Sequence, residues 1–190
     1  MKLKGSETEK NLLAAFAGES QARNRYTYFA SVARNEGYQQ IMAIFEETAN
    51  QEKEHAKRFY KHLEGGDVEI TAMYPAGDMG TTADNLLHAA MGEKHEHSVL
   101  YPMFAKVARK EGFKDVAATF DAVSVAEKHH EKRYLDLLKV VKEKSVFKKA
   151  KATTWTCRNC GYVHKGADAP KICPACKHEQ PYFQLLCEKF

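Results

Sequence analysis

The sequence of 190 residues predicts an all-α four-helix bundle with one long crossover connection, followed by a small C-terminal β-rich domain. Three observations lead to this prediction. Long segments carry apolar residues at helical spacing, the first pair of such segments is repeated further along the chain, and all cysteines lie near the C-terminus. The expected boundaries are 1–145 for the bundle, 146–152 for a linker and 153–190 for the C-terminal domain.

The composition is that of a soluble globular protein, with 44% hydrophobic and 28% charged residues. The net charge of +4 is mild, and the one basic block, residues 142–151, is more simply a solvated linker than a nucleic-acid contact. The N-terminus lacks the apolar stretch of a signal peptide, and no apolar run approaches the roughly 20 residues that cross a bilayer. We therefore expect a cytoplasmic protein without a nucleic-acid or membrane partner.

Residues 7–37 and 40–64 are expected to form the first two helices. Gly37 and the pair Gly65–Gly66 end them, because glycine readily takes the left-handed conformation found after a helix. One stripe of the first helix has three- and four-residue spacing, and it consists of Leu12, Ala15, Phe16, Glu19, Ala22, Arg23 and Tyr26.

Residues 83–111 and 114–143 are expected to form the third and fourth helices, with Thr81 or Thr82 as the N-cap of the third. The preceding segment, 67–81, has no helical period. It is unusually long for a connection between antiparallel neighbours and suits a crossover that travels the whole length of the bundle.

The two helical pairs are copies of one unit. A shift of 75 positions relates Tyr26 to Tyr101, Glu52 to Glu127 and His55 to His130. Glu19 matches Glu93 only with a shift of 74, so the third helix contains one extra residue before Tyr101. An insertion of this kind produces a π-bulge or reflects simple sequence drift. We favour the bulge, because such bulges gather at functional sites.

Each second helix of a pair carries a Glu-x-x-His motif, Glu52 to His55 and Glu127 to His130. The spacing of three places the carboxylate and the imidazole on adjacent turns of one face, so both can reach a single ion. With one inward glutamate from each first helix, these residues make the di-iron or di-manganese pattern of ferritin-like bundles. The inward glutamates are Glu19 and Glu93, and Glu96, one turn beyond, is a further candidate.

Two interpretations of these carboxylates are open. Glutamate is common on exposed helix faces, so the first interpretation is that the motifs are surface charges. Their symmetric placement beside small residues favours the second, metal binding, because four converging carboxylates in an apolar bundle need cations to offset their repulsion.

Other side chains on the same helices have more than one possible role. Tyr26 and Tyr101 lie about two turns from the inward glutamates, where each either packs or holds a metal-binding carboxylate through its hydroxyl. Three other histidines fall on other faces, where we expect exposure to solvent: His95, His97 and His129.

Two C-x-x-C motifs near the C-terminus predict a tetrahedral metal site. They are separated by twelve residues, a spacing that strongly indicates metal binding, and the ligands are Cys157, Cys160, Cys173 and Cys176. Zinc and iron both accept four thiolates, so a structural zinc ribbon is the alternative to an iron site. Cys187 has no such partner and is expected to be a free thiol.

Together the two sites resemble those of the rubrerythrin family, over essentially the whole chain. Glu96 is the specific mark, since plain ferritin-like sites lack this glutamate. The implied ligands of a carboxylate-bridged di-iron pair are Glu19, Glu52, Glu93, Glu127 and His130. The resemblance also implies that Glu96 and His55 are alternative ligands of one iron, exchanged with its oxidation state. The four cysteines would hold a third iron in a rubredoxin-like domain.

The activity that this resemblance implies is a peroxidase reaction, the reduction of hydrogen peroxide to water in oxidative stress protection. Electrons would come from a rubredoxin or an NAD(P)H-dependent rubredoxin reductase, and the protein would be a homodimer. Two rival functions are iron storage or iron oxidation, and a non-enzymatic zinc-ribbon interaction protein. The electron-relay domain argues against the first rival, and the inward carboxylates argue against the second.

Overall fold

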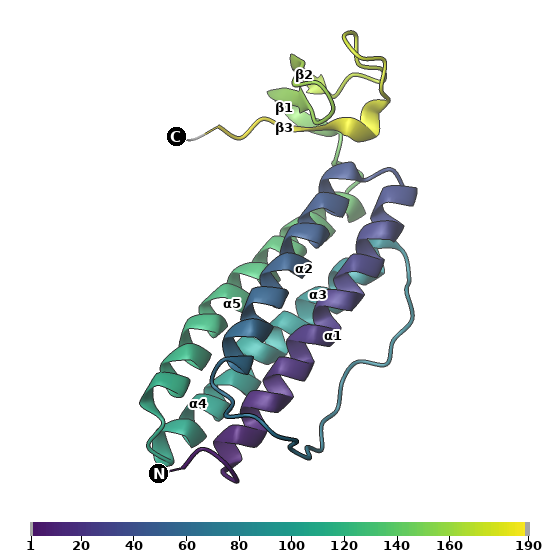
Figure 1. The fold of residues 1–190 in the computed structure, drawn as a ribbon. Coiled ribbons are helices and arrows are strands. Elements are labelled where there is room, and N and C mark those ends of the chain that lie inside the picture. Colours follow the sequence, from purple (N-terminus) through teal and green to yellow (C-terminus); the bar gives the residue numbers. More distant parts are fainter. Residues whose placement is uncertain (1, 189–190) are drawn as a thin grey trace.

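The computed structural model describes residues 2–188 and has a long helical bundle with a small sheet domain beyond one end (Figure 1). The helices of the bundle are α1 (Glu7–Asn35), α2 (Gln39–Tyr60), α3 (Thr82–His95), a π-helical turn η1 (Glu96–Leu100), α4 (Tyr101–Lys110) and α5 (Lys114–Lys142). The C-terminal domain contains β1 (Lys148–Cys157), β2 (Val163–Asp168), a 3-10 turn η2 (Gln180–Tyr182) and β3 (Phe183–Leu185). The predicted fold class is confirmed.

The connection between α2 and α3 runs along the outside of the bundle from one end to the other, as predicted (Figure 1). Helix α2 ends at Tyr60, a few residues earlier than expected. At the start of α3, the Thr81 side chain accepts a hydrogen bond from the Asp84 backbone N–H, and the Asp84 carboxylate accepts one from the Thr81 backbone N–H. This capping box satisfies N–H groups at the helix start, so the chain turns into α3 at a defined residue.

The extra residue of the third helix forms the π-helical turn that the sequence predicts. Residues Glu96–Leu100 are π-helical, and the Tyr101 backbone N–H donates to the carbonyl of Glu96, five residues earlier. The helix absorbs the insertion as a wider turn and then resumes the α-helical pattern in α4. Glu96 stands at the first position of this turn.

The internal repeat is also visible in the way each half caps the other. The Glu111 carboxylate accepts a hydrogen bond from the Thr8 backbone N–H at 2.9 Å, at the start of α1. The Glu36 carboxylate accepts one from the Thr82 backbone N–H at 3.1 Å, at the start of α3. Because Glu36 and Glu111 are equivalent in the repeat, each half of the bundle caps a helix of the other half with an equivalent contact.

Two apolar clusters fill the bundle, one on each side of its middle. The first contains Tyr26, Phe45 and Tyr134, and the second contains Phe59 and Phe120, all of them almost fully buried. Along α1, α2 and α5 the inward glutamates fall between the residues of the two clusters. The polar site is therefore enclosed by apolar packing at both ends.

The C-terminal domain is a three-stranded antiparallel sheet in the order β2-β1-β3. Its first strand begins at Lys148, inside the segment expected to be a linker. The rings of Tyr38 and Phe147 stack at the junction with the bundle, with centroids 6.3 Å apart and planes 9° apart. The domain boundaries given above stay a prediction.

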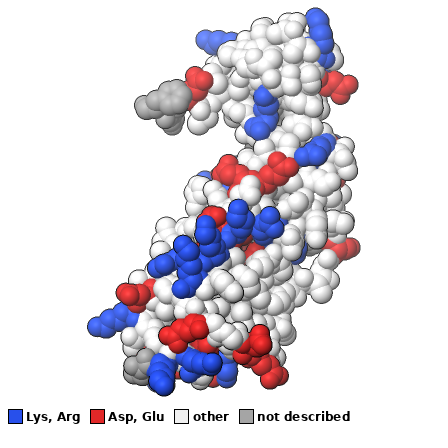
Figure 2. All heavy atoms as spheres, viewed as in Figure 1, with Lys and Arg blue, Asp and Glu red and all other residues white. Residues whose placement is uncertain are grey.

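On the face drawn in Figure 2, basic and acidic side chains are interspersed, with one group of Lys and Arg over the middle of the bundle. The expectation that the protein binds no nucleic acid stays a prediction. No helix within residues 2–188 is both long enough and apolar enough to cross a membrane.

Candidate metal centres

Four helices each bring one carboxylate to the middle of the bundle. Glu19 from α1, Glu52 from α2, Glu93 from α3 and Glu127 from α5 are all at most 1% exposed. Such burial is very rare for glutamate unless a partner offsets its charge. The interpretation of these residues as surface charges is therefore wrong.

The histidines of the two Glu-x-x-His motifs join the carboxylates in two overlapping groups of ligand atoms. Within each group all ligand atoms lie within 4.8 Å of one another. One group is Glu19, Glu52, His55 and Glu127, and the other is Glu52, Glu93, Glu127 and His130. Because two carboxylates belong to both groups, the arrangement suits two neighbouring ions with shared ligands.

The hydrogen bonding of the carboxylates fits bound cations. Within residues 2–188, Glu19 Oε2, Glu93 Oε2 and both carboxylate oxygens of Glu127 are buried without a well-aligned hydrogen-bond donor. A buried oxygen without a donor is costly, and a cation removes that cost. Carboxylate and imidazole donors in this combination are suitable ligands for iron.

The pKa values of the buried groups indicate the same need for positive charge. Burial, and then the charges of Glu127 and Glu52, raise the pKa of Glu19 well above its usual range. Burial opposes a charge on His130, but the carboxylates of Glu127 and Glu52, with oxygens 2.7 and 3.2 Å from its Nδ1, outweigh burial and raise the His130 pKa to about 12. At His55, burial again opposes the charge, and the carboxylates of Glu127 and Glu52 again outweigh burial and raise the pKa to about 10. The site therefore requires positive charge, whether from protons or from metal ions.

Two buried tyrosines hold the glutamates that belong to only one group. Tyr26 Oη donates to Glu93 Oε1 at 2.6 Å, and Tyr101 Oη donates to Glu19 Oε1. Burial, followed by the charge of the paired glutamate, raises the pKa of both phenols, so each remains a donor. Each tyrosine binds the glutamate of the opposite half of the repeat, which leaves the second oxygen of that glutamate for an ion.

Glu96 lies outside both groups of ligand atoms. It is half-buried at the start of η1, and its negative charge is among the causes that raise the pKa of Glu19. Burial, and then the charge of Glu93, raise the pKa of Glu96 itself, so Glu96 lies close to both groups without being part of either.

The surroundings of three further histidines differ from one another. His95 and His129 are exposed, as predicted. The prediction for His97 is wrong, because its Nε2 lies 2.7 Å from Glu131 Oε2 and both side chains are less than one-fifth exposed. Gln51 was not predicted to belong to the site, yet its Oε1 lies 3.0 Å from His130 Nε2. The one sign in the sequence that Gln51 could belong to the site was its position directly before Glu52.

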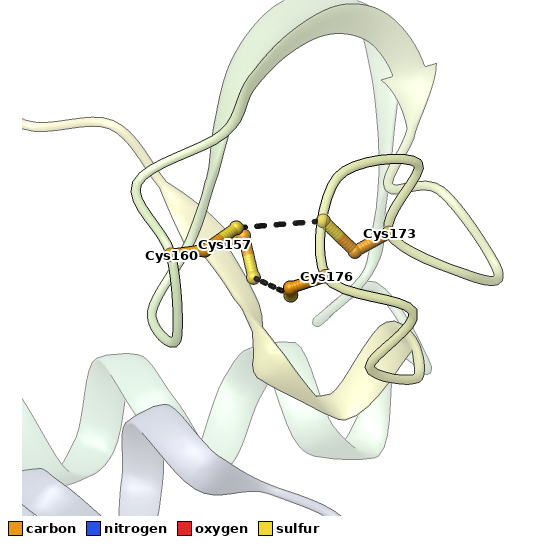
Figure 3. Close-up of side chains that lie close together, drawn as sticks. All are labelled: Cys157, Cys160, Cys173 and Cys176. Carbon is orange, nitrogen blue, oxygen red and sulfur yellow. Dashed lines mark hydrogen bonds between the residues drawn. The ribbon is translucent and has the colours of Figure 1, made fainter.

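The four cysteines of the C-x-x-C motifs converge in the C-terminal domain (Figure 3). The Cys157 and Cys176 sulfurs are 3.7 Å apart, as are those of Cys160 and Cys173. A tetrahedral ion with metal–sulfur bonds of about 2.3 Å requires sulfur separations of roughly 3.8 Å. The spacing of the sulfurs therefore fits one tetrahedral ion. Cys187 is exposed and does not belong to this cluster.

A backbone hydrogen bond closes each C-x-x-C turn. Gly161 N donates to Cys157 O at 2.8 Å, and Lys177 N donates to Cys173 O at 3.0 Å. Gly161 and Lys177 both have a left-handed backbone, with φ of 76° and 64°, so the two turns have similar geometry. A backbone N–H of His178 is the main cause that lowers the pKa of Cys176, to about 6, which favours the thiolate that binds metal.

Comparison with known proteins agrees with both sites. Residues 10–138 match the family model described as Rubrerythrin, and residues 155–184 match the one described as Rubrerythrin, rubredoxin-like domain. The rubrerythrin of Nitratidesulfovibrio vulgaris is 56% identical over 184 residues, covering 97% of this chain and 96% of that protein. The rubrerythrin of Porphyromonas gingivalis is 59% identical over 184 residues, covering 97% and 92%.

A solved structure of fully reduced, all-ferrous nigerythrin superimposes with a TM-score of 0.64 at 32% identity, covering 97% of this chain and 91% of that chain. The bundle is thus ferritin-like and has a di-iron site with carboxylate and histidine ligands, and the C-terminal domain has a rubredoxin-like four-cysteine site. On these matches over nearly its whole length, the chain belongs to the rubrerythrin family.

Proposed function

We propose that this protein is a non-haem di-iron peroxidase that reduces hydrogen peroxide to water and so protects against oxidative stress. The observation that carries this proposal is the presence, in one chain, of a buried carboxylate–histidine site and a separate four-cysteine site. Iron storage needs only the first, whereas a sustained reduction also needs a path for electrons. When bound, the iron pair supplies both electrons for H2O2 + 2e− + 2H+ → 2H2O, and the four-cysteine iron replaces them singly.

The proposed roles of the ligands follow the two groups of ligand atoms. Glu52 and Glu127 belong to both groups, so we assign them as bridging ligands. The terminal ligands are Glu19 and His55 at one ion, and Glu93 and His130 at the other. Tyr26 and Tyr101 keep the terminal carboxylates in one orientation, and Cys157, Cys160, Cys173 and Cys176 hold the single iron.

Glu96 is assigned as an alternative to His55. The more highly charged ferric ion prefers an anionic oxygen, whereas ferrous iron accepts a neutral imidazole. Glu96 would therefore replace His55 on oxidation and leave again on reduction. Its place in the π-helical turn, outside both groups of ligand atoms but close enough for its charge to act on Glu19, supports this role.

The distance between the two sites of one chain supports a homodimer. The four-cysteine domain lies beyond the end of the bundle at which α2 begins (Figure 1). Glu52 lies thirteen residues after the start of α2, which is about 20 Å further along the helix. Electron transfer slows steeply with distance, so the four-cysteine site of one protomer would serve the di-iron site of its partner.

Electrons would enter from a rubredoxin or an NAD(P)H-dependent rubredoxin reductase. Cys160 is exposed, whereas Cys157 and Cys173 are buried, so a donor protein can approach the ion from the Cys160 side. The proposed location is the cytoplasm, where reducing conditions keep thiols available.

The variant Cys173→Ala tests the electron path. Chemically reduced in advance, it should consume a single equivalent of peroxide per di-iron site and then stop, because the reductase can no longer supply electrons. The parent and a Cys187→Ala control should both continue to turn over. Sustained peroxide consumption by Cys173→Ala at the parent rate would contradict the proposal. An iron-storage protein would oxidise added ferrous iron equally well in all three forms and sustain peroxide reduction in none.

A further inference from the structure

The histidines of the two Glu-x-x-His motifs are equivalent in the repeat but differ in their surroundings. The side chain of His130 is 4% exposed and that of His55 is 17% exposed. The Nδ1 atom of each ring faces the carboxylates, 2.7 Å from Glu127 Oε2 for His130 and 2.9 Å from Glu52 Oε2 for His55. The difference between the two rings lies at the other nitrogen.

The Nε2 atom of His130 has a partner whose orientation is fixed by charge. It lies 3.0 Å from Gln51 Oε1, and Arg133 Nη2 donates to the same oxygen at 3.3 Å. The amide nitrogen of Gln51 donates to Glu47 at 3.3 Å. A flipped amide would turn its NH2 toward the guanidinium and its oxygen toward a carboxylate, so Gln51 Oε1 can only accept from His130. His130 Nε2 must therefore carry the proton, which leaves the Nδ1 electron pair for the metal.

Arg133 is itself held in place by helix α2. Its guanidinium donates to Glu47 Oε1 and to Thr48 Oγ1, each at 2.6 Å, and the Arg133 side chain is 19% exposed. Arg133 belongs to α5 and Gln51 to α2, so this contact joins the two helices that carry the Glu-x-x-His motifs.

The repeat shows that His55 lacks this support. The shift of 75 carries Gln51 onto Ala126, Glu47 onto Ala122, Thr48 onto Val123 and Arg133 onto Arg58. Alanine has no acceptor, and in the part of the chain that the structure describes, His55 Nε2 has no hydrogen-bond partner. The corresponding cation is Arg58, and its charge acts on His62 instead. Burial, and then the charge of Arg58, lower the pKa of His62.

A second break in the repeat concerns Glu96. With the shift of 74 that relates Glu19 to Glu93, Glu96 is the counterpart of Ala22. The additional carboxylate therefore has no equivalent in the other half of the repeat. The exchange of the proposed function would therefore pair the histidine without an Nε2 partner with the carboxylate that the repeat does not duplicate.

We propose that Gln51 and Arg133 are positioning residues that keep His130 bound in both oxidation states, while Ala126 leaves His55 free to give way to Glu96. This inference rests on the ligand set of the proposed function and states which residues decide the side on which exchange takes place. On this proposal, the two histidines behave differently because only His130 has a hydrogen-bond partner at Nε2, and not because their Glu-x-x-His motifs differ.

The first test uses the iron-loaded, chemically reduced full-length protein and the rate at which a ferrous chelator removes iron. Gln51→Ala should speed the loss of one of the two irons by about 10- to 100-fold, the usual effect of losing such a partner. Gln51→Glu should restore the slow rate, because a carboxylate still accepts from His130 Nε2. Parent-level iron release in Gln51→Ala, with His130 unmoved in its crystal structure, would overturn the positioning role.

The second test adds an acceptor for His55. Crystals of Ala126→Gln, oxidised and reduced, should show His55 bound in both states and Glu96 excluded, whereas the size control Ala126→Ser should behave as the parent. Exchange that persists in an Ala126→Gln variant whose introduced amide is seen bonded to His55 would refute the role of Ala126. If the parent itself shows one ligand set in both states, the proposed exchange fails, and the Gln51→Ala release rate still decides separately whether Gln51 holds His130.

Discussion

The two metal sites of this protein are built on scaffolds of very different strength. The di-iron site lies between two apolar clusters within four helices, each cluster containing more than ten buried side chains. The four-cysteine site lies in a three-stranded sheet whose cluster has five buried residues, two of them the metal ligands Cys157 and Cys173. We therefore expect the bundle to fold without its ions and the C-terminal domain to depend on its ion for stability.

The difference also extends to how the ligands are held. In the bundle, tyrosine hydroxyls and the Gln51 amide position carboxylates and imidazoles from separate helices. In the C-terminal domain, each pair of cysteines belongs to one tight turn, and the ion joins the two turns. A preformed site can therefore exchange a ligand without unfolding, while a site that holds its own domain together is expected to keep its ligands fixed.

Removal of all metal should give the largest effect and the clearest separation. Structural zinc ions contribute about 10–16 kcal/mol to the folding of small zinc-finger peptides, and a comparable dependence on metal should unfold the C-terminal domain while the bundle stays helical. Trp155 is the single tryptophan, is fully buried in the C-terminal domain, and its Nε1 donates to Gly166 O at 3.0 Å. A red shift of its fluorescence with unchanged far-ultraviolet circular dichroism of the helices would support the comparison. Loss of both signals together would contradict the expected difference between the two domains.

Phe120→Ala should destabilise the bundle and leave the C-terminal domain unchanged. Phe120 is fully buried and packs on Phe59, Tyr101 and Phe104, so its truncation should lower the unfolding free energy of the bundle by about 3–5 kcal/mol. Urea unfolding followed by circular dichroism measures this loss, and the Trp155 signal of the metal-loaded domain should keep its parent midpoint. A matched control, Val125→Ala on the exposed face of the same helix, should change stability by no more than about 0.5 kcal/mol.

The metal-depleted bundle should become less stable as the pH rises. The pKa values of His55 and His130 are raised from 6.5 to about 10 and about 12 in the folded chain. A group whose pKa is raised on folding contributes stability that is complete below its pKa in the unfolded chain. This stability is lost as the pH rises toward its pKa in the folded chain. Glu19 and Glu93 act in the same direction, because their pKa values are raised well above 4.5. The folded chain therefore keeps protons that the unfolded chain releases as the pH rises past this value.

Urea unfolding of metal-depleted protein from about pH 6.5 to about pH 9.5 measures this effect, with a slope of at most about 1.4 kcal/mol per pH unit for each proton. The metal-loaded bundle should show little slope, because cations replace the protons. Equal slopes with and without metal would mean that these buried groups do not control the stability of the bundle.

The smallest expected effect concerns the capping box at the start of α3. Thr81→Ala removes the side chain that accepts from the Asp84 N–H, which should cost the bundle about 1 kcal/mol. The Trp155 signal should again be unaffected, and Thr71→Ala, an exposed position in the crossover connection, serves as the control. A loss as large as that of Phe120→Ala would show that the crossover carries more of the bundle's stability than its exposed surface suggests.

The sequence by itself determined the elements and most of the ligand types. Helical spacing defined the bundle, the shift of 75 identified the two halves, and the slip to 74 predicted the π-helical turn at Glu96. These features are local or repeat at a fixed distance, so they can be recognised without coordinates. The pairs of C-x-x-C turns were equally recognisable, because ligand spacing within a turn is set by the backbone alone.

The tertiary structure decided which residues meet across the bundle. It pairs Tyr26 with Glu93 of the opposite half, excludes Glu96 from both groups of ligand atoms, and brings Gln51 to His130. It also pairs His97 with Glu131, where exposure was expected, and starts β1 inside the expected linker. Contacts between helices depend on the distance and the rotation of one helix relative to another. A periodic pattern gives the face on which a side chain lies, but not the partner that faces it across the bundle.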